Sequence, residues 1–395
     1  MKRFFSYIIL SFFLLLLPTG QASANNNDSI RLSLLTCAPG EEIYSLFGHT
    51  AIRYENSSQG IDVVFNYGLF SFNTPNFIFR FSLGETDYQL GATDYERFAA
   101  EYAFFGRSVW QQTLNLTDEE KTELIRLLQE NYRPENRVYR YNFFYDNCAT
   151  RPRDKIEESI AGKVIYPAEP QDGSLTFRDI VHQYCKGHPW ARFGIDLCIG
   201  SEADQPITQR QMMFAPFYLM DAFDGAQIKS DSIQRPLITA NELVVDATPE
   251  PDESGWMPTP LQCTLLLFIL TTAATIYGIR RRTGLWGIDL FLFGIAGIVG
   301  CVLAFLALFS QHPAVNSNFL LLVFHPGQLL FLPYIIYCVR KGKKCWYLTL
   351  NLAVLTLFIV LFPVIPQRFD FAVVPLALVL LIRSASNLIV TSKKK

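Results

Sequence analysis

The sequence predicts an α+β soluble domain followed by an all-α bundle of five transmembrane helices. Two observations lead to this fold class. Residues 25–260 read as a mixed globular stretch, whereas residues 261–395 are almost continuously apolar. Within the apolar part, Arg and Lys gather in alternate loops, as they do in membrane proteins. A chain of 395 residues has room for one sizeable soluble domain beside such a bundle.

The N-terminus has the pattern of a secretory signal peptide. Two basic residues precede the apolar run 4–17, and residues 22–24 (Ala-Ser-Ala) provide a cleavage site. An uncleaved membrane helix is the alternative, but the apolar run is short for a span. We therefore expect residues 1–24 to be removed and residues 25–247 to form an exported domain.

Short runs rich in β-branched and aromatic residues predict strands in the first half of the exported domain. Gly, Asn, Pro and Asp separate these runs. The expected strands are residues 30–36, 50–54, 62–66, 77–83 and 108–114.

Three helices interrupt or follow these strands. Residues 94–105 have helical periodicity, and residues 117–120 form a capping box that opens a second helix. A third helix should begin at or just after Cys148, because Pro152 is tolerated only in the first turn. A linker rich in proline and acidic residues, residues 248–260, then leads to the membrane domain, residues 261–395.

Five apolar runs approach or exceed the ~20 residues that cross a bilayer. They are residues 261–279, 285–309, 319–339, 346–365 and 369–390. If the soluble domain lies outside the cytoplasm, the basic clusters 280–282, 340–344 and 393–395 all face the cytoplasm, and the two outer loops carry only Arg368. Signal peptide and charge distribution thus favour the same topology.

Polar residues interrupt two of these spans. Arg383 lies near the cytoplasmic end of the fifth span, where its long side chain is expected to reach the headgroups. His325 interrupts the third span together with a proline and a glycine. It is either a functional residue or a satisfied histidine in a kinked helix.

Two segments contain the residue types of a thiol enzyme. His49 follows a glycine at the start of an expected strand, and Cys148 follows a polar turn at the start of an expected helix. A helix N-terminus favours a thiolate, so we expect a lowered pKa for Cys148. Close in space, the two residues would form a nucleophile and its base. The alternatives are a buried or disulfide-bonded cysteine and a structural histidine.

The segments 44–54 and 141–151 resemble the Lnb N-terminal periplasmic domain family and, behind it, the circularly permuted papain-like superfamily with its NlpC-type amidases. Permuted members place the catalytic His first, on a strand, and the Cys later, in an Asn-Cys pair that opens a helix. His49 and the pair Asn147-Cys148 have this order. Further similar segments are residues 35–40, 193–197, 207–219, 311–313 and 316–318.

The resemblance implies a permuted papain-like fold and a lipoprotein N-acyltransferase. Its site would move an acyl chain from a phospholipid donor through a Cys148 thioester to the α-amine of a diacylated apolipoprotein, without a cofactor or metal. The protein would be a multi-pass protein of the bacterial inner membrane whose catalytic domain faces the periplasm. The alternatives are a membrane-anchored peptidoglycan amidase of NlpC type and a non-enzymatic envelope scaffold.

The third catalytic residue and the rival nucleophile are less well marked. Permuted members have a polar residue on the strand after the His strand, which makes Asn66 the candidate, with Asp62 behind it; a plain turn residue is the alternative for Asn66. Cys37 is the rival nucleophile, but it precedes Pro39 and Gly40 rather than a helix.

The remaining cysteines are expected to be structural. Cys185 and Cys198 should form a disulfide in an oxidising compartment, although His182 and His188 beside them leave a zinc site open. The cysteines in or beside the membrane spans read as packing residues: Cys263, Cys301, Cys338 and Cys345. The net charge of −2 gives no indication of a nucleic-acid partner.

Overall fold

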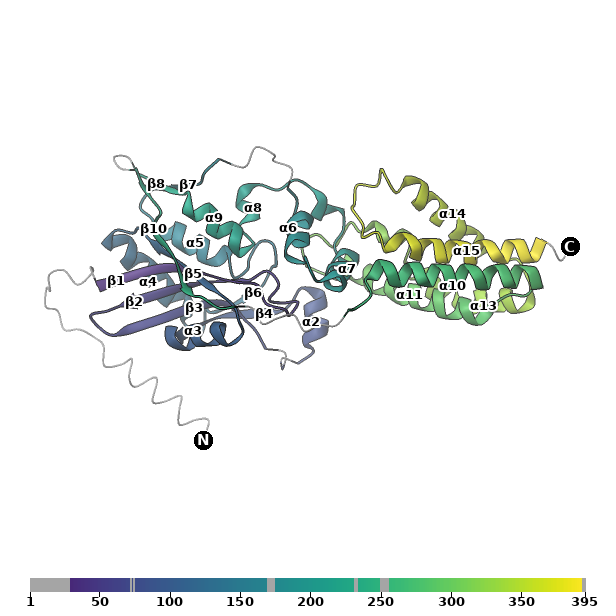
Figure 1. Cartoon of the computed structure of the whole chain (residues 1–395), viewed down its shortest axis with the longest axis horizontal. Coiled ribbons are helices and arrows are strands. Elements are labelled where there is room, and N and C mark those ends of the chain that lie inside the picture. Colours follow the sequence, from purple (N-terminus) through teal and green to yellow (C-terminus); the bar gives the residue numbers. More distant parts are fainter. Residues whose placement is uncertain are drawn as a thin grey trace, which may run out of the picture.

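A computed structural model describes residues 29–71, 73, 75–168, 175–230, 234–248 and 256–392. An α+β part lies at one end of the molecule, and a bundle of long helices, coloured green to yellow, lies at the other (Figure 1). The expected signal peptide and residues 249–255 of the expected linker lie outside the described residues.

An antiparallel sheet of seven strands forms the centre of the α+β part, in the order β10-β5-β1-β2-β3-β4-β6. Its strands are β1 (Ile30–Cys37), β2 (His49–Asn56), β3 (Ile61–Leu69), β4 (Asp87–Asp94), β5 (Val109–Leu114), β6 (Val138–Arg140) and β10 (Ile238–Val245). A smaller sheet contains β7 (Lys163–Ile165), β8 (Gln227–Lys229) and β9 (Gln234–Pro236).

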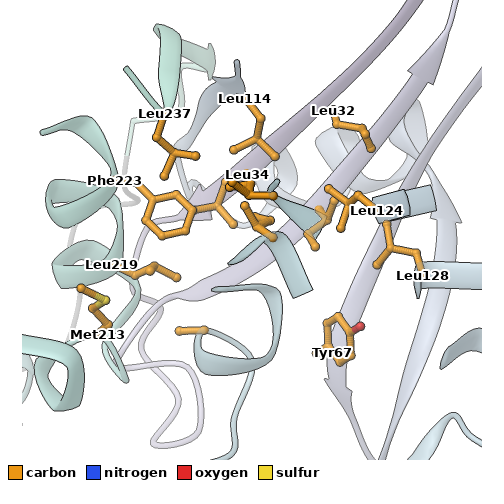
Figure 2. Packing of buried hydrophobic residues seen from close by; sticks show 14 of the residues in the cluster. Leu32, Leu34, Tyr67, Leu114, Leu124, Leu128, Met213, Leu219, Phe223 and Leu237 are labelled. Atoms are coloured by element: carbon orange, nitrogen blue, oxygen red, sulfur yellow. The ribbon is translucent and has the colours of Figure 1, made fainter. Parts of the chain in front are cut away.

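Helices cover both faces of the large sheet. Side chains of α4 (Asp118–Tyr132), α5 (Thr150–Ser159) and α9 (Pro216–Asp224) form the main core with one face of the sheet. Figure 2 shows Leu124 of α4 and Phe223 of α9 approaching this core from opposite ends. The helix α3 (Tyr95–Phe104) contributes to a separate cluster on the other face. The predicted capping box at the start of α4 is confirmed.

Four of the five predicted strands are confirmed, but the strand at residues 77–83 is wrong. This segment is a helix, α2 (Phe77–Leu83), between Asn76 and Gly84, both of which have left-handed backbone conformations. Residues 79–83 alternate between apolar and polar side chains, as in a half-buried strand, but they form a helix in which no residue is buried. The strand that pairs with β3 is β4, and α2 packs on the membrane part.

The membrane part has three helices that are long and apolar enough to cross a bilayer, within the described residues: α10 (Pro260–Arg281), α11 (Trp286–Phe309) and α15 (Val373–Ser392). The third predicted span is broken into η3 (Phe319–Leu322), α12 (Gly327–Leu330) and α13 (Leu332–Lys341), with a bend of 74°. The helix α14 (Trp346–Leu361) is apolar but has 16 residues, about 24 Å at 1.5 Å per residue. The structure thus contains three or four candidate spans, and five spans stay a prediction.

The polar residues of the spans face the bundle interior. Arg383 is buried and paired with Asp289 of α11 through contacts of 2.7 and 3.0 Å, so the expectation that it reaches the headgroups is wrong. A charge inside an apolar bundle is tolerated where an opposite charge meets it. His325 lies at the break of the third span and contacts Asn351 (Nε2 to Oδ1, 3.3 Å), as expected of a satisfied histidine in a kinked helix.

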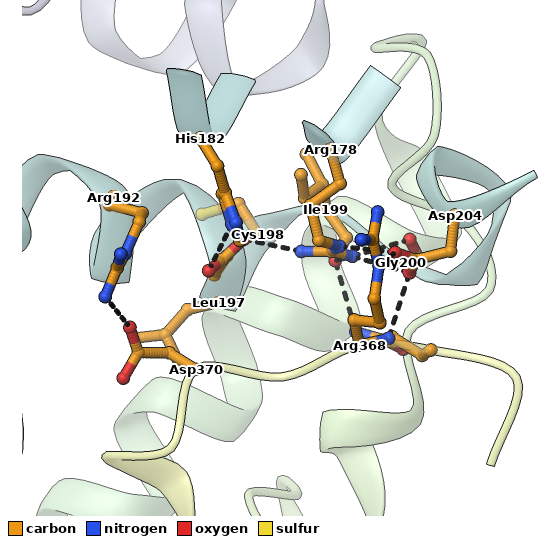
Figure 3. A network of polar contacts seen from close by, with 12 residues as sticks. Arg178, His182, Arg192, Leu197, Cys198, Ile199, Gly200, Asp204, Arg368 and Asp370 are labelled. Carbon is orange, nitrogen blue, oxygen red and sulfur yellow. Dashed lines mark hydrogen bonds and ion pairs between the residues drawn. The ribbon is translucent and has the colours of Figure 1, made fainter. Parts of the chain in front are cut away.

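The α+β part is fixed directly to the two loops of the bundle that were predicted to face outward. The junction is built by α6 (Phe177–Tyr184), α7 (Pro189–Cys198), η2 (Ser201–Asp204) and α8 (Gln209–Met212). Figure 3 shows Arg368 of one loop meeting Asp204 (Nε to Oδ1, 2.9 Å), and Arg192 meeting Asp370. In the other loop, Ala314 accepts a hydrogen bond from Gly200 N–H at 2.6 Å. The contacts bring the folded domain close to the helix ends.

Candidate active site

Cys148 lies where the ladder between β2 and β3 stops. The last pair of this ladder is Ala51 and Asn66, and the strand is irregular at Gly68, which has φ +91°. A Cβ atom on Gly68 would lie 3.6 Å from Cβ of Cys148. The backbone N–H of Thr50 hydrogen-bonds the Cys148 sulfur. The thiol therefore occupies the open end of the β2–β3 pair, against the backbone of Thr50, which follows His49 in the sequence.

His49 and Asn66 contact each other across this end of the sheet. The imidazole Nε2–H donates to Asn66 Oδ1 at 3.2 Å. With Nε2 carrying the proton, Nδ1 is left as the nitrogen that can accept one. Asn66 is buried, which fixes its amide. Strand β3 therefore orients the imidazole on β2, which is the arrangement expected of a base and its orienting residue.

Asn147 holds the backbone of the Cys148 turn. Its Oδ1 accepts hydrogen bonds from Ala149 N–H (2.8 Å) and Thr150 N–H (3.0 Å). Its Nδ2 donates to the carbonyls of Phe143 (2.7 Å) and Phe214 (2.9 Å). The side chain is nearly inaccessible to solvent. Asn147 therefore occupies the first free N–H groups of α5 and fixes the position of the cysteine next to it.

The expected lowering of the Cys148 pKa is wrong in sign. Burial raises the pKa of the thiol to about 11, and hydrogen bonds from the backbone N–H groups of Thr50 and Cys148 and from the Tyr141 hydroxyl offset this only in part. The helix begins two residues later, at Thr150, and Asn147 takes up its first donors. Desolvation of the charged form therefore outweighs the helix dipole.

Burial also lowers the pKa of His49, to about 4, against the opposing effect of the Asn66 hydrogen bond; the nearby Arg107 guanidinium lowers it further. At neutral pH the resting site therefore contains a neutral thiol and a neutral imidazole. The thiol proton would leave as the sulfur attacks, because a resting ion pair is unfavourable in these surroundings.

The two other residues considered for the site have different roles. Cys37 is fully buried on β1, directly opposite His49 in the strand register, and burial raises the pKa of its thiol to about 12. Because the Cys37 thiol is inaccessible to substrate, Cys37 is a poor candidate for the nucleophile. Asp62 does not lie behind Asn66; it forms a bidentate ion pair with Arg53 at 2.8 and 2.6 Å.

The predicted disulfide between Cys185 and Cys198 is wrong: both thiols are free. Cys185 is buried in an apolar cluster at the end of α6, and Cys198 is the last residue of α7. His182 Nε2 contacts Asp196 at 2.9 Å. No group of three or more metal-ligating side chains occurs among the described residues, so the zinc alternative has no support in this part of the chain.

Three features of the site escaped sequence reasoning. The Tyr141 hydroxyl and the Thr50 N–H, which both contact the thiol, could be identified only once the chain was folded. Gly68 carries a stronger signal, since a glycine near the end of a strand often marks a close approach of another segment.

Two family matches span most of the chain. Residues 20–182 match the Lnb N-terminal periplasmic domain, and residues 252–395 match the Lnb transmembrane domain. The first match contains His49, Asn66 and Cys148. No curated protein and no solved structure matches the chain significantly. With both domains of that family present in sequence, the chain belongs to the Lnb family.

Proposed function

We propose that the protein is a lipoprotein N-acyltransferase of the inner membrane in which Cys148 is the nucleophile, His49 the base and Asn66 the residue that orients the base. Membership of the Lnb family supports lipoprotein N-acylation. The observation that carries the assignment of residues is the position of the Cys148 sulfur on the Thr50 N–H, next to the hydrogen-bonded pair His49–Asn66.

The first half-reaction is transfer of an acyl chain from a phospholipid to Cys148. The sulfur attacks the ester carbonyl while His49 Nδ1 takes the thiol proton. The carbon–oxygen bond then breaks, and the imidazolium returns the proton to the departing oxygen of the lysophospholipid. The products are an acyl thioester and an alcohol, and the imidazole is neutral again.

The second half-reaction transfers the chain to the N-terminal diacylglyceryl cysteine of an apolipoprotein. Its α-amine attacks the thioester, His49 removes the extra proton and the thiol is restored as an amide forms. Each half-reaction places negative charge on the carbonyl oxygen. The N–H groups of Thr50 and Cys148, which lie at the sulfur, are the best placed donors for it, because Asn147 occupies those of Ala149 and Thr150.

The attachment of the domain supports a lipid substrate over a soluble one. Arg368 and Asp370 of one outer loop and Ala314 of the other bind the α+β part directly. An enzyme acting on the cell wall needs a site that reaches away from the bilayer, whereas this domain is held at the helix ends. Both proposed substrates are anchored at the same surface.

The proposal is tested by looking for the covalent acyl-enzyme intermediate. Full-length protein in phospholipid vesicles without lipoprotein should accumulate an acyl group on the peptide containing Cys148, and neutral hydroxylamine should release it. A diacylated lipopeptide with a free α-amine should then discharge the adduct. Cys148→Ala should abolish the adduct, and His49→Ala should slow it by at least about a hundredfold. Asn66→Ala should reduce it less than His49→Ala, because the base is displaced rather than lost.

Cys37→Ala is the matched control and should retain most of the adduct, because its thiol is buried. Product formation from both substrates without a detectable adduct would refute the thioester route. An amidase would instead cleave muropeptides without a lipid adduct, and a scaffold would do neither.

A further inference from the structure

The helix α2 presents apolar side chains outward at the junction of the two parts. None of its residues is buried, and Ile78, Phe79 and Phe81 are 80%, 58% and 46% exposed. Scattered exposed apolar residues are common, but several on one short helix form a patch that usually marks an interaction surface.

The same helix is bound to the end of a membrane helix. His312 Nε2–H donates to the Phe81 carbonyl at 2.6 Å, and Gln311 N–H donates to the Leu83 carbonyl at 2.8 Å. The ring of Phe79 lies 5.9 Å from that of Phe305 in α11. The two backbones approach so closely that a Cβ on Gly84 would lie 2.8 Å from the His312 nitrogen. Figure 1 shows α2 on the side of the α+β part that faces the bundle.

The apolar surface of α2 therefore continues that of α11. At this end of α11, Leu308 and Phe309 are also largely exposed, as expected of side chains that face lipid. The charged residue of α2, Arg80, is turned to the folded domain, where Nη2 pairs with Asp87 at 2.7 Å. The outward side of α2 is thus apolar and borders the lipid-facing side of a candidate span.

A row of aromatic rings connects α2 with the candidate nucleophile. The first ring of the row carries the hydroxyl that contacts the Cys148 sulfur. Neighbouring rings have centroids 4.2 to 6.1 Å apart, within the range of direct aromatic contact. In order from the thiol, the row contains Tyr141, Tyr88, Phe70, Phe77 and Phe81.

We propose that α2 is the lipid-access helix of this protein and that the aromatic row marks the path that one acyl chain of an outer-leaflet phospholipid follows while its ester reaches Cys148. The inference rests on the proposed acyltransferase function. An acyl chain fits because the α2 surface is continuous with the lipid-facing side of α11 and the row offers apolar ring contacts up to the sulfur. The hydrocarbon is thereby led from the bilayer to the thiol without crossing water.

The experiment compares two acyl donors on the full-length protein in vesicles of phosphatidylethanolamine and phosphatidylglycerol. One donor is the vesicle phospholipid, and the other is a water-soluble short-chain ester. Ile78→Glu should slow Cys148 acylation from the vesicle by about tenfold or more, the effect of losing the burial of one large apolar side chain. With the soluble ester, the rate of Cys148 acylation in Ile78→Glu should stay within about twofold of that of the unmodified protein. Ile78→Leu should behave like the unmodified protein with both donors.

Phe104→Glu is the matched control. Phe104 is also 80% exposed but lies on α3, on the sheet and away from the bundle (Figure 1), so this variant should change neither rate. If Ile78→Glu slows both donors equally, α2 only supports the fold of the site and the proposal is overturned. It is equally overturned if Ile78→Glu leaves the vesicle reaction unchanged.

Lipid contact can be measured without any chemistry. A fluorophore on Ile78→Cys, in a background in which all eight native cysteines are replaced by Ala, should be quenched by spin-labelled phospholipid, and one on Phe104→Cys in the same background should not. Quenching without acylation in the unmodified protein would leave the lipid contact standing and refute the proposed reaction. Absence of quenching at position 78 would refute the access helix itself.

Discussion

Substitution of Asn147 by Ala removes the side chain that fixes the turn before the candidate nucleophile. Four hydrogen bonds of 2.7 to 3.0 Å disappear, and the backbone groups that they satisfied stay buried. At about 1 kcal/mol net for each bond, the expected loss of unfolding free energy is roughly 4 kcal/mol. For a domain of about 200 residues this corresponds to a fall in Tm of roughly 8–16 °C.

The assay is thermal unfolding of the full-length protein in detergent, followed by fluorescence. Asn142→Ala is the matched control, because it removes a single exposed hydrogen bond in the same loop, from Tyr145 N–H to Oδ1 at 3.2 Å. Its Tm should fall by less than about 4 °C. If both variants unfold within a few degrees of the unmodified protein, Asn147 does not hold the turn, and the account of why an asparagine precedes Cys148 fails.

Two further predictions concern ionisable groups. The pKa of His49 is lowered to about 4 in the folded protein, so the unfolded chain takes up a proton that the folded chain does not as the pH falls from 6.5 to 4. The free energy of unfolding, measured with urea, should therefore fall by about 3 kcal/mol between pH 6.5 and pH 4. If His49→Gln does not reduce this dependence of stability on pH, the low pKa does not belong to His49. Within the bundle, Arg383→Leu alone should cost about 3–5 kcal/mol by leaving Asp289 unpaired, whereas the double variant with Asp289→Leu should be more stable than the single one. Equal stability of the two variants would show that the pair is not desolvated.

Local sequence signals predicted the elements whose formation is decided locally. The capping box at Thr117 and the β-branched runs of β1, β2 and β5 correspond to observed elements. The strand β4 (Asp87–Asp94) was missed, because its sequence contains a glycine and few β-branched residues and its pairing with β3 is a tertiary effect. The segment 77–83 was assigned to the wrong class for the same reason: residues 79–83 alternate like a strand, whereas the contact of α2 with α11 is a tertiary effect.

The same distinction between local and tertiary effects applies to the candidate site. The pairing of two neighbouring strands brings His49 and Asn66 together, and both strands were predicted from the sequence although their register was not. The pKa of Cys148 depends mainly on how deeply the folded chain buries the sulfur, and the hydrogen bonds of Thr50 and Tyr141 offset this burial only in part. A rule based on the helix N-terminus alone therefore gave the wrong sign.

The raised pKa of Cys148 has a physical consequence for the proposed thioester. The rings and strand ends that desolvate the thiol would also keep water from an acyl group on the same sulfur, and hydrolysis competes with transfer to an amine only where water has access. A site open enough to stabilise the thiolate by hydration would also admit water to the thioester. Iodoacetamide should therefore label Cys148 slowly at pH 7 and faster as the pH approaches about 11, because the reactive form is the thiolate. Complete labelling at pH 7 within the time needed for an exposed thiol would show that the sulfur is already ionised, and the link between burial and a protected intermediate would be refuted.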